Sequence, residues 1–235
     1  QNEKIIYKTT SKGIRYLKGY EEIKRYKDSI MEGVKEEDNN FRYLRHFYNP
    51  NEPEKGYANN ETALEWGAIG YSDNPNNMWD WEDAKAYYRD GDRQKAYKAV
   101  GHVIHLLEDL SMPLHTHKIA HDGIFHGEEA GFETYFSKLI KDSANSLPPE
   151  YSQTSKLEKA KDIKAQFEGT AKLTFGACMQ ENKMVNFDDY YGTGKQLKIP
   201  DDQTTALMGQ YLFPKAIERA AGLLAYFHDT MNPSM

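Results

Sequence analysis

The sequence predicts an all-α protein. Apolar residues recur at helical spacing along most of the chain, whereas the alternation typical of strands is found nowhere in it. Stretches rich in Gly, Asn, Asp and Pro separate the periodic segments. The 235 residues are 39% hydrophobic and 13% aromatic, which is enough to fill a core, and no internal repeat or low-complexity linker divides them. We therefore expect one domain, residues 1–235.

The amino-terminal part of the chain predicts a long helix, a loop and a short helix. Residues from about 12 to 36 carry apolar side chains between acidic and basic ones, as an amphipathic helix does. The segment NPNEPEKGYANN, residues 49–60, is rich in turn formers and predicts a loop. Asn60 and Glu61 then open a short helix that runs through Leu64 and Ile69.

Five further helices are expected in the rest of the chain. After the break SDNPNN, a helix over about 81–89 and a longer one over about 92–110 are separated by the turn RDGD. The longer helix should be central and buried on its Val100, Ile104 and Leu107 side. The remaining helices are expected over about 128–143, 155–180 and 203–231, with the loop DDYYGTGKQLKIPDD between the last two.

The end of the 92–110 helix has the residues of a metal site. Six of the eight histidines lie within this short region, at positions 102, 105, 115, 117, 121 and 126. His105 and Asp109 are four residues apart and share a helical face, and the SMP that follows ends the helix, so that His115 can return beside them. Clustered imidazoles with carboxylates favour zinc or a similar divalent ion over calcium, which takes oxygen ligands.

Charge and motif content exclude several classes of function. The net charge of −6 comes with no basic stripe, so we expect no duplex nucleic acid partner. A phosphodiester substrate is compatible with this charge, because bound cations supply positive charge locally. The chain has no GxSxG elbow, P-loop or CxxC pair, and its single cysteine, Cys178, excludes an internal disulfide. Nothing resembles a signal peptide or a transmembrane run, so a secreted protein would be present here in its mature form.

Three motifs together resemble a known family. RHFYNP (45–50), AYKAVGHVIHLLEDLSMPLHTH (96–117) and HGEEAGFETYF (126–136) occur in the order and at the separations typical of the zinc-dependent phospholipase C and P1 nuclease family. The resemblance covers the layout from about residue 30 to 136. It implies a single-domain, multi-helix phospholipase C/P1 nuclease-like fold. It also implies secretion, contact with a membrane surface, and hydrolysis of phosphodiester bonds by metal-activated water.

The resemblance also implies particular ligands. His46 of the HFY element would join His105 and Asp109 on one zinc ion, and Asp38 in VKEEDNN would contact both this metal and the attacking water as a general base. His115 would bind a second zinc ion. The remaining histidines, His102, His117, His121 and His228, are expected to have no chemical role, although His117 could orient a ligand.

The remaining ligands of the second zinc ion are a histidine and a glutamate in the family. Glu133 in FETYF matches the glutamate, and His126 is the nearest candidate for the histidine. The family separates this pair by four residues, which would put Glu129 at the histidine position, whereas His126 lies seven residues before Glu133. Seven residues of helix span about 10 Å, too far for one metal. Either His126 lies in a loop that folds back, or Glu129 has replaced it.

The third zinc site of the family has no match in this chain. It uses an amino-terminal tryptophan and an early histidine, and residues 1–45 contain neither residue type. We therefore expect two zinc ions, with a third doubtful. Three functions stay open: a phospholipase C acting on phospholipid headgroups, a single-strand nuclease of the same family, and a catalytically weak member that binds metal and a ligand or membrane surface.

Overall fold

The described residues of the computed structural model are helical, and no strand occurs among them. They are residues 19–57, 60–69, 78–118, 131–143, 147–152, 160–180 and 202–233, without the side chains of 131–134 and 177–180. The α-helices are α1 (Tyr20–Arg25), α2 (Lys27–Glu36), α3 (Trp81–Arg89), α4 (Arg93–Asp109), α5 (Pro113–Thr116), α7 (Gly131–Asp142), α8 (Pro149–Ser152), α9 (Ile163–Gln180) and α11 (Asp202–Met231). Arg42–Arg45 form the 3₁₀ helix η1, and Glu65–Ile69 form the π-helix η3. The all-α prediction is confirmed.

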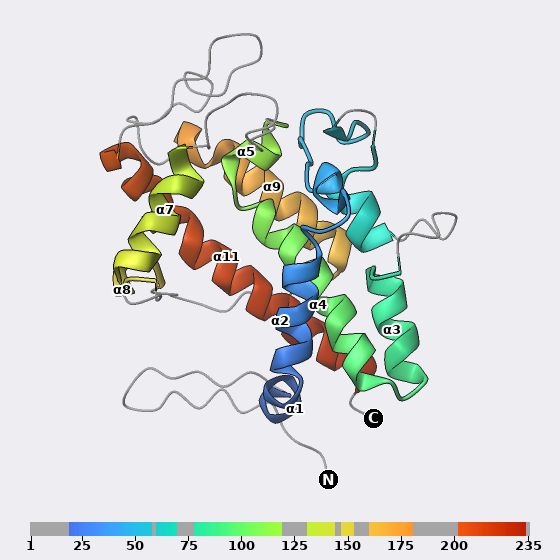
Figure 1. Ribbon diagram of the computed structural model, residues 1–235. Helices are drawn as coiled ribbons and strands as arrows, with labels where there is room; N and C mark the ends of the chain where they lie inside the picture. The colour runs from blue at the N-terminus through green and yellow to red at the C-terminus, as the bar shows by residue number, and fades with distance from the viewer. Residues whose placement is uncertain are drawn as a thin grey trace.

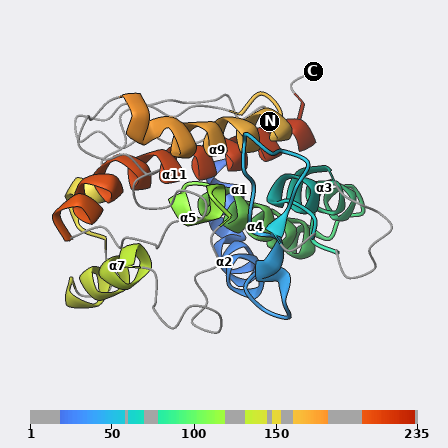
Figure 2. The same cartoon turned by 90° about the horizontal axis from the view of Figure 1, so that it is seen from above.

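Helix α4 lies at the centre of the fold, as the sequence predicts. In Figures 1 and 2 it runs between α2 on one side and α11 on the other, with α3 alongside and α9 next to α11. Val100, Ile104 and Leu107 are all buried, at 0%, 4% and 1% exposure. The main hydrophobic core surrounds this face, so α4 is held on several sides at once. Side chains at its carboxyl end therefore have a rigid support.

Two aspartates set the starts of α3 and α4. Asp80 accepts a hydrogen bond from the backbone N–H of Asp83, and Asp83 accepts one from that of Asp80, which makes a capping box. Asp92 caps α4 by accepting from the backbone N–H of Lys95. Gly91, with φ of 87°, makes the turn between the two helices. These local signals explain why both predicted ranges agree with the structure to within a residue or so.

Helices α2 and α4 touch through two glycines. A β-carbon on Gly101 would overlap the carbonyl oxygen of Ile30 and lie 2.9 Å from its carbonyl carbon. A β-carbon on Gly33 would overlap the carbonyl oxygen of Lys98 in the same way. The two backbones are in contact, and any larger residue at either position would push the helices apart. This close approach brings the end of α2 beside the end of α4.

Several element boundaries differ from the prediction. The helix expected over about 12–36 is interrupted at Tyr26, which separates α1 from α2, and its residues 12–18 lie outside the described part of the chain. The short helix opens at Thr62 rather than Asn60, because Thr62 and Glu65 exchange capping hydrogen bonds. Helix α9 begins at Ile163, after Asp162 accepts from the backbone N–H of Ala165. The helices η1, α5 and α8 were not predicted.

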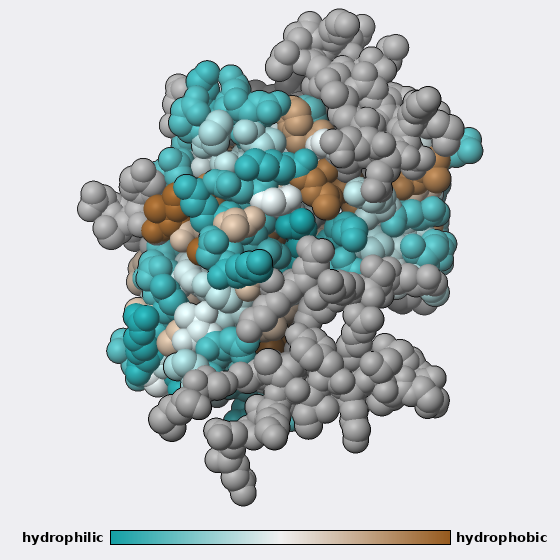
Figure 3. Space-filling model, turned by 180° about the vertical axis from the view of Figure 1, so that it is seen from behind, coloured by the Kyte–Doolittle hydropathy of each residue, from teal (hydrophilic) through white to brown (hydrophobic). Residues whose placement is uncertain are grey.

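The long helix α11 joins the main core to a smaller one. Its amino-terminal half packs against α7 and α8 in a second hydrophobic cluster, whose buried members are Leu114, Phe136, Tyr151, Met208 and Leu212. The described surface seen in Figure 3 is mostly hydrophilic, with hydrophobic residues in small separate groups. Within the described ranges, no helix is both long and apolar enough to cross a membrane.

Candidate metal centre

Four of the predicted ligands meet at the carboxyl ends of α2 and α4. Asp38 lies two residues beyond α2, His46 directly follows η1, and His105 and Asp109 lie one turn apart on α4. Three separate segments thus supply four metal-competent side chains. The parallel packing of α2 on α4 at Gly33 and Gly101 is what places Asp38 beside the α4 pair.

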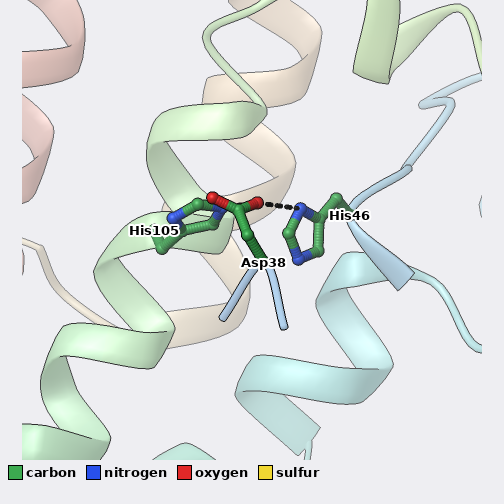
Figure 4. Close-up of side chains that lie close together, drawn as sticks. All are labelled: Asp38, His46 and His105. Carbon is green, nitrogen blue, oxygen red and sulfur yellow. Dashed lines mark ion pairs between the residues drawn. The ribbon is translucent and has the colours of Figure 1, made fainter. Parts of the chain in front are cut away.

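The ligand atoms of these side chains converge. Oδ2 of Asp109 lies 2.7 Å from Nδ1 of His46 and 3.3 Å from Nε2 of His105. Oδ1 of Asp38 lies 3.3 Å from the same His105 nitrogen and 3.9 Å from Nδ1 of His46. Figure 4 shows the Asp38 carboxylate between the two imidazole rings. The side chain of Asp38 is 64% exposed, whereas those of His46 and Asp109 are 2% and 17% exposed, so the cluster is buried on one side and open at Asp38.

His115 adjoins this cluster. It is buried in α5, its ring stacks on Phe47 with centroids 5.0 Å apart, and its Nδ1 contacts the backbone oxygen of His46 at 3.2 Å. The same nitrogen lies 3.8 Å from Oδ2 of Asp109. His46, Asp109 and His115 therefore form a second group close enough to hold one ion, and His46 and Asp109 belong to both this group and the four-residue cluster. Asp109 stands between the two groups, where a carboxylate can bridge two metals.

The other predicted ligands of the second zinc ion cannot be placed. His126 and the alternative Glu129 lie outside the described residues, and so does the side chain of Glu133, whose backbone belongs to α7. These three assignments stay predictions. His117, which the sequence suggested could orient a ligand, stacks on Phe175 with ring centroids 4.3 Å apart.

The donor set fits a divalent transition metal. Nε2 of His105 and Oδ2 of Asp109 are buried and make no hydrogen bond of suitable geometry among the described residues, although they are 3.3 Å apart. Oδ2 of Asp109 also lies 2.7 Å from Nδ1 of His46, and Oδ1 of Asp38 lies 3.3 Å from Nε2 of His105, so the four side chains surround one common point. Two imidazole nitrogens and two carboxylate oxygens around such a point form a set that suits zinc.

The metal-free cluster holds protons that a cation would displace. Burial would raise the pKa of Asp109, but the charges of His115, His105 and His46 hold it well below its ordinary value. Burial would lower the pKa of His46, yet the charge and hydrogen bond of Asp109 raise it to about 9. The pKa of His105 is raised against burial by Asp109 and Asp38. Metal binding must therefore release protons from the histidines.

Sequence reasoning missed Glu37, which adjoins the cluster. Its side chain is fully buried and hydrogen-bonded to Arg42, Trp66 and His102. Burial would raise its pKa, but the hydrogen bond of His102, the nearby His46 and the charge of Arg42 hold the pKa below its ordinary value. In the sequence Glu37 belongs to the acidic run KEED, which is typical of a solvated helix end. Only its neighbour Asp38 was singled out.

A cavity borders the cluster on the α11 side. It has a volume of about 340 Å³ and reaches Asp109. Its other lining residues are mostly apolar and come from α4, α11 and the segments beside them: Glu108, Ser111, Met112, Leu147, Leu212, Phe213, Ala216 and Ile217. An apolar group can therefore lie next to the candidate ligands.

Comparison with known proteins gives a likeness in structure alone. No protein-family model matches the chain, and no curated protein matches its sequence. The alpha-toxin of an avian strain of Clostridium perfringens superimposes with a TM-score of 0.57 and 13% identity, over 92% of this chain and 57% of the toxin chain. The alpha-toxin of Clostridium absonum gives a TM-score of 0.58 and 14% identity, over 93% and 58%. The chain thus spans less than two thirds of either toxin. At this identity the comparison shows the fold alone: the chain has the all-α fold of the clostridial alpha-toxins.

Proposed function

We propose that this protein is a zinc-dependent phosphodiesterase, and that it acts as a phospholipase C on phospholipid headgroups. The observation that carries the proposal is the convergence of Asp38, His46, His105 and Asp109 within a fold like that of alpha-toxin. The first zinc ion is assigned to these four residues. The second is assigned to His115 with Glu133 and either His126 or Glu129.

Three of the four residues are largely buried, whereas the fourth, Asp38, also faces solvent. When bound, zinc supplies a Lewis acid that lowers the pKa of water and offsets the negative charge of a phosphate. His46, His105 and Asp109 are held by α4 and its neighbours. Asp38 is the most exposed of the four, so its carboxylate can take a proton from the attacking water as a general base. The oxygen of that water bonds to phosphorus as the oxygen–phosphorus bond to the leaving alcohol breaks; the alcohol takes up a proton from solvent, and Asp38 releases its proton to solvent.

The cavity beside Asp109 favours a lipid substrate over a nucleic acid. Its lining is dominated by aliphatic side chains such as Leu212 and Ile217, and Phe213 is the one aromatic residue among its described lining. A single-strand nuclease needs exposed aromatic faces on which bases stack. Here Phe213 is packed edge-on against Phe136, with ring centroids 4.6 Å apart. An apolar leaving group such as diacylglycerol suits this surface better than a nucleotide.

The test is hydrolysis by the zinc-loaded protein. Phosphatidylcholine vesicles, a soluble phosphocholine ester and single-stranded DNA are offered in parallel, with and without a chelator. We expect hydrolysis of the phosphocholine substrates, loss of activity with the chelator, and recovery when zinc is restored. Cleavage of DNA instead would support the nuclease, and no hydrolysis of any phosphodiester by fully loaded protein would support the binding protein.

Two variants assign the roles within the site. Asp38→Asn should lower kcat by about a hundredfold or more, because it removes the general base. Asp28→Asn is the matched control, since Asp28 lies on α2 with a side chain 91% exposed. Ala216→Trp should fill the cavity, impair hydrolysis of vesicles and leave the soluble ester as a substrate. Equal effects on vesicles and ester would contradict the assignment of the cavity to the lipid.

A further inference from the structure

Glu37 is a charged residue in a place where charge is costly. Its side chain is 0% exposed, and a buried carboxylate is tolerated only when hydrogen bonds and an opposite charge replace its water. Oε2 accepts from Nε and Nη2 of Arg42, at 2.9 and 2.7 Å, and contacts Nδ1 of His102 at 2.5 Å. Oε1 accepts from Nε1 of Trp66 at 2.9 Å.

These partners fix the orientation of the carboxylate. Arg42 belongs to η1, Trp66 to η3 and His102 to α4, so three elements hold Glu37 from different directions. Two guanidinium groups, those of Arg42 and Arg45, lie over the Trp66 ring at 4.8 and 4.3 Å from its centroid. A carboxylate held in this way cannot rotate without breaking several hydrogen bonds. Its remaining contacts are therefore equally fixed.

The remaining contact is with the candidate ligand His46. Oε1 of Glu37 lies 3.7 Å from Nε2 of His46, while Nδ1 of the same ring lies 2.7 Å from Oδ2 of Asp109. Nε2 is buried, and no other described group makes a hydrogen bond to it. One imidazole thus has a buried carboxylate at one nitrogen and the metal cluster at the other. Histidines that bind metals are typically oriented by such a carboxylate at the second nitrogen.

We propose that Glu37 is a positioning residue of the metal centre: it holds the His46 ring with Nε2 protonated, so that the lone pair of Nδ1 points at Asp38, His105 and Asp109. Arg42, Trp66 and His102 serve to keep Glu37 in place. The proposal rests on the metal site that the proposed function uses. Its test measures metal binding rather than hydrolysis, so either one can fail without the other.

The first experiment compares zinc affinity in two variants, measured by competition with a chromophoric chelator. Glu37→Gln keeps the shape and removes the charge, and zinc affinity should fall by about 10 to 100-fold. The control is Glu22→Gln. Glu22 lies on α1, far from the metal cluster at the opposite end of α2. Like Glu37, it is a carboxylate beside a buried histidine: its Oε2 lies 3.4 Å from Nε2 of His228. A folded Glu37→Gln protein with wild-type affinity overturns the proposal.

Glu37→Asp covers the case in which Glu37→Gln does not fold. It retains the negative charge that pairs with Arg42, and its shorter side chain withdraws both oxygens from His46, so it should bind zinc more weakly than the Glu22→Gln control. Wild-type affinity in this variant also overturns the proposal. Circular dichroism at the assay temperature establishes that each variant is folded.

The second experiment observes the His46 ring directly. Long-range ¹H–¹⁵N spectra of the imidazoles in the zinc-loaded protein should show the metal at Nδ1 of His46 and a proton at Nε2. In Glu37→Gln the resonances of His46 should shift, while those of His228 stay unchanged. Zinc at Nε2 of His46 would overturn the proposal, because that nitrogen faces Glu37.

Discussion

Replacing Gly101 by Ala tests whether backbone contact between α2 and α4 builds the metal centre. The new β-carbon would lie 2.9 Å from the carbonyl carbon of Ile30 and overlap the oxygen. Ordinary contacts between carbon atoms are about 3.5–4.0 Å, and the oxygen is nearer still, so the two helices must move apart by at least roughly 0.6–1.1 Å. Asp38 follows α2 and lies 3.3 Å from His105, so this movement withdraws a ligand oxygen from the cluster.

The cost follows from two opposing effects. Overpacking of this kind costs about 1–3 kcal/mol, while replacing a helical glycine by alanine contributes about 1 kcal/mol of stability. Gly176→Ala isolates the second effect, because Gly176 lies in α9 and a β-carbon there meets nothing within 4 Å. The two variants should therefore differ in stability by about 1–3 kcal/mol, with each kcal/mol worth about 2–4 °C in Tm for a chain of this size.

Thermal unfolding of the metal-free proteins, followed by circular dichroism, measures this difference. Zinc titration of the same samples then shows whether affinity falls in Gly101→Ala and stays unchanged in Gly176→Ala. If Gly101→Ala is as stable as Gly176→Ala and binds zinc like the wild type, the close helix contact does not position Asp38, and the geometric argument for the site is wrong.

Two further predictions concern the charges of the cluster. Asp109→Ala should lower both the zinc content and the Tm of the zinc-loaded protein, because metal binding contributes to folded-state stability. Elemental analysis measures the zinc content and calorimetry the Tm, and either quantity left unchanged would count against Asp109 as a ligand. The stability of the metal-free protein should fall as the pH rises from about 6.5 to about 9. On folding, the pKa of His46 is raised from 6.5, the value of an ordinary histidine, to about 9. Protonated His46 therefore stabilises the folded state fully below pH 6.5, and this stabilisation is lost as the pH rises through about 9. The free energy of unfolding, measured with denaturant, should fall over this pH range with chelator present and stay constant with zinc bound. A free energy that is independent of pH under both conditions would refute this prediction.

Local patterns determined what the sequence could predict. The bounds of α3 and α4 follow from Asp80, Asp92 and the turn at Gly91, all of which act within a few residues. The i, i+4 spacing of His105 and Asp109 needs no tertiary information either, because helical geometry alone puts both on one face. The burial of Val100 and Ile104 follows from the same periodicity.

Other features depend on contacts between segments distant in the chain. The break at Tyr26 cannot be seen in the periodicity, because apolar residues continue through it; the Tyr26 ring stacks on Tyr97 of α4, with centroids 5.0 Å apart. The helices η1, α5 and α8 have four residues each, too few for a local pattern to specify.

The sequence by itself determined the helical class and the pair of ligands on α4, because both follow from spacing along one helix. The family resemblance predicted that Asp38 and His46 join that pair, but the tertiary structure brings them there: backbone contact at Gly33 and Gly101 sets the separation of α2 and α4, and so the position of Asp38. It also decided which acidic residue of KEED is buried. Glu37 and Asp38 are adjacent and chemically alike, but Arg42, Trp66 and His102 replace water around one carboxylate and leave the other in solvent.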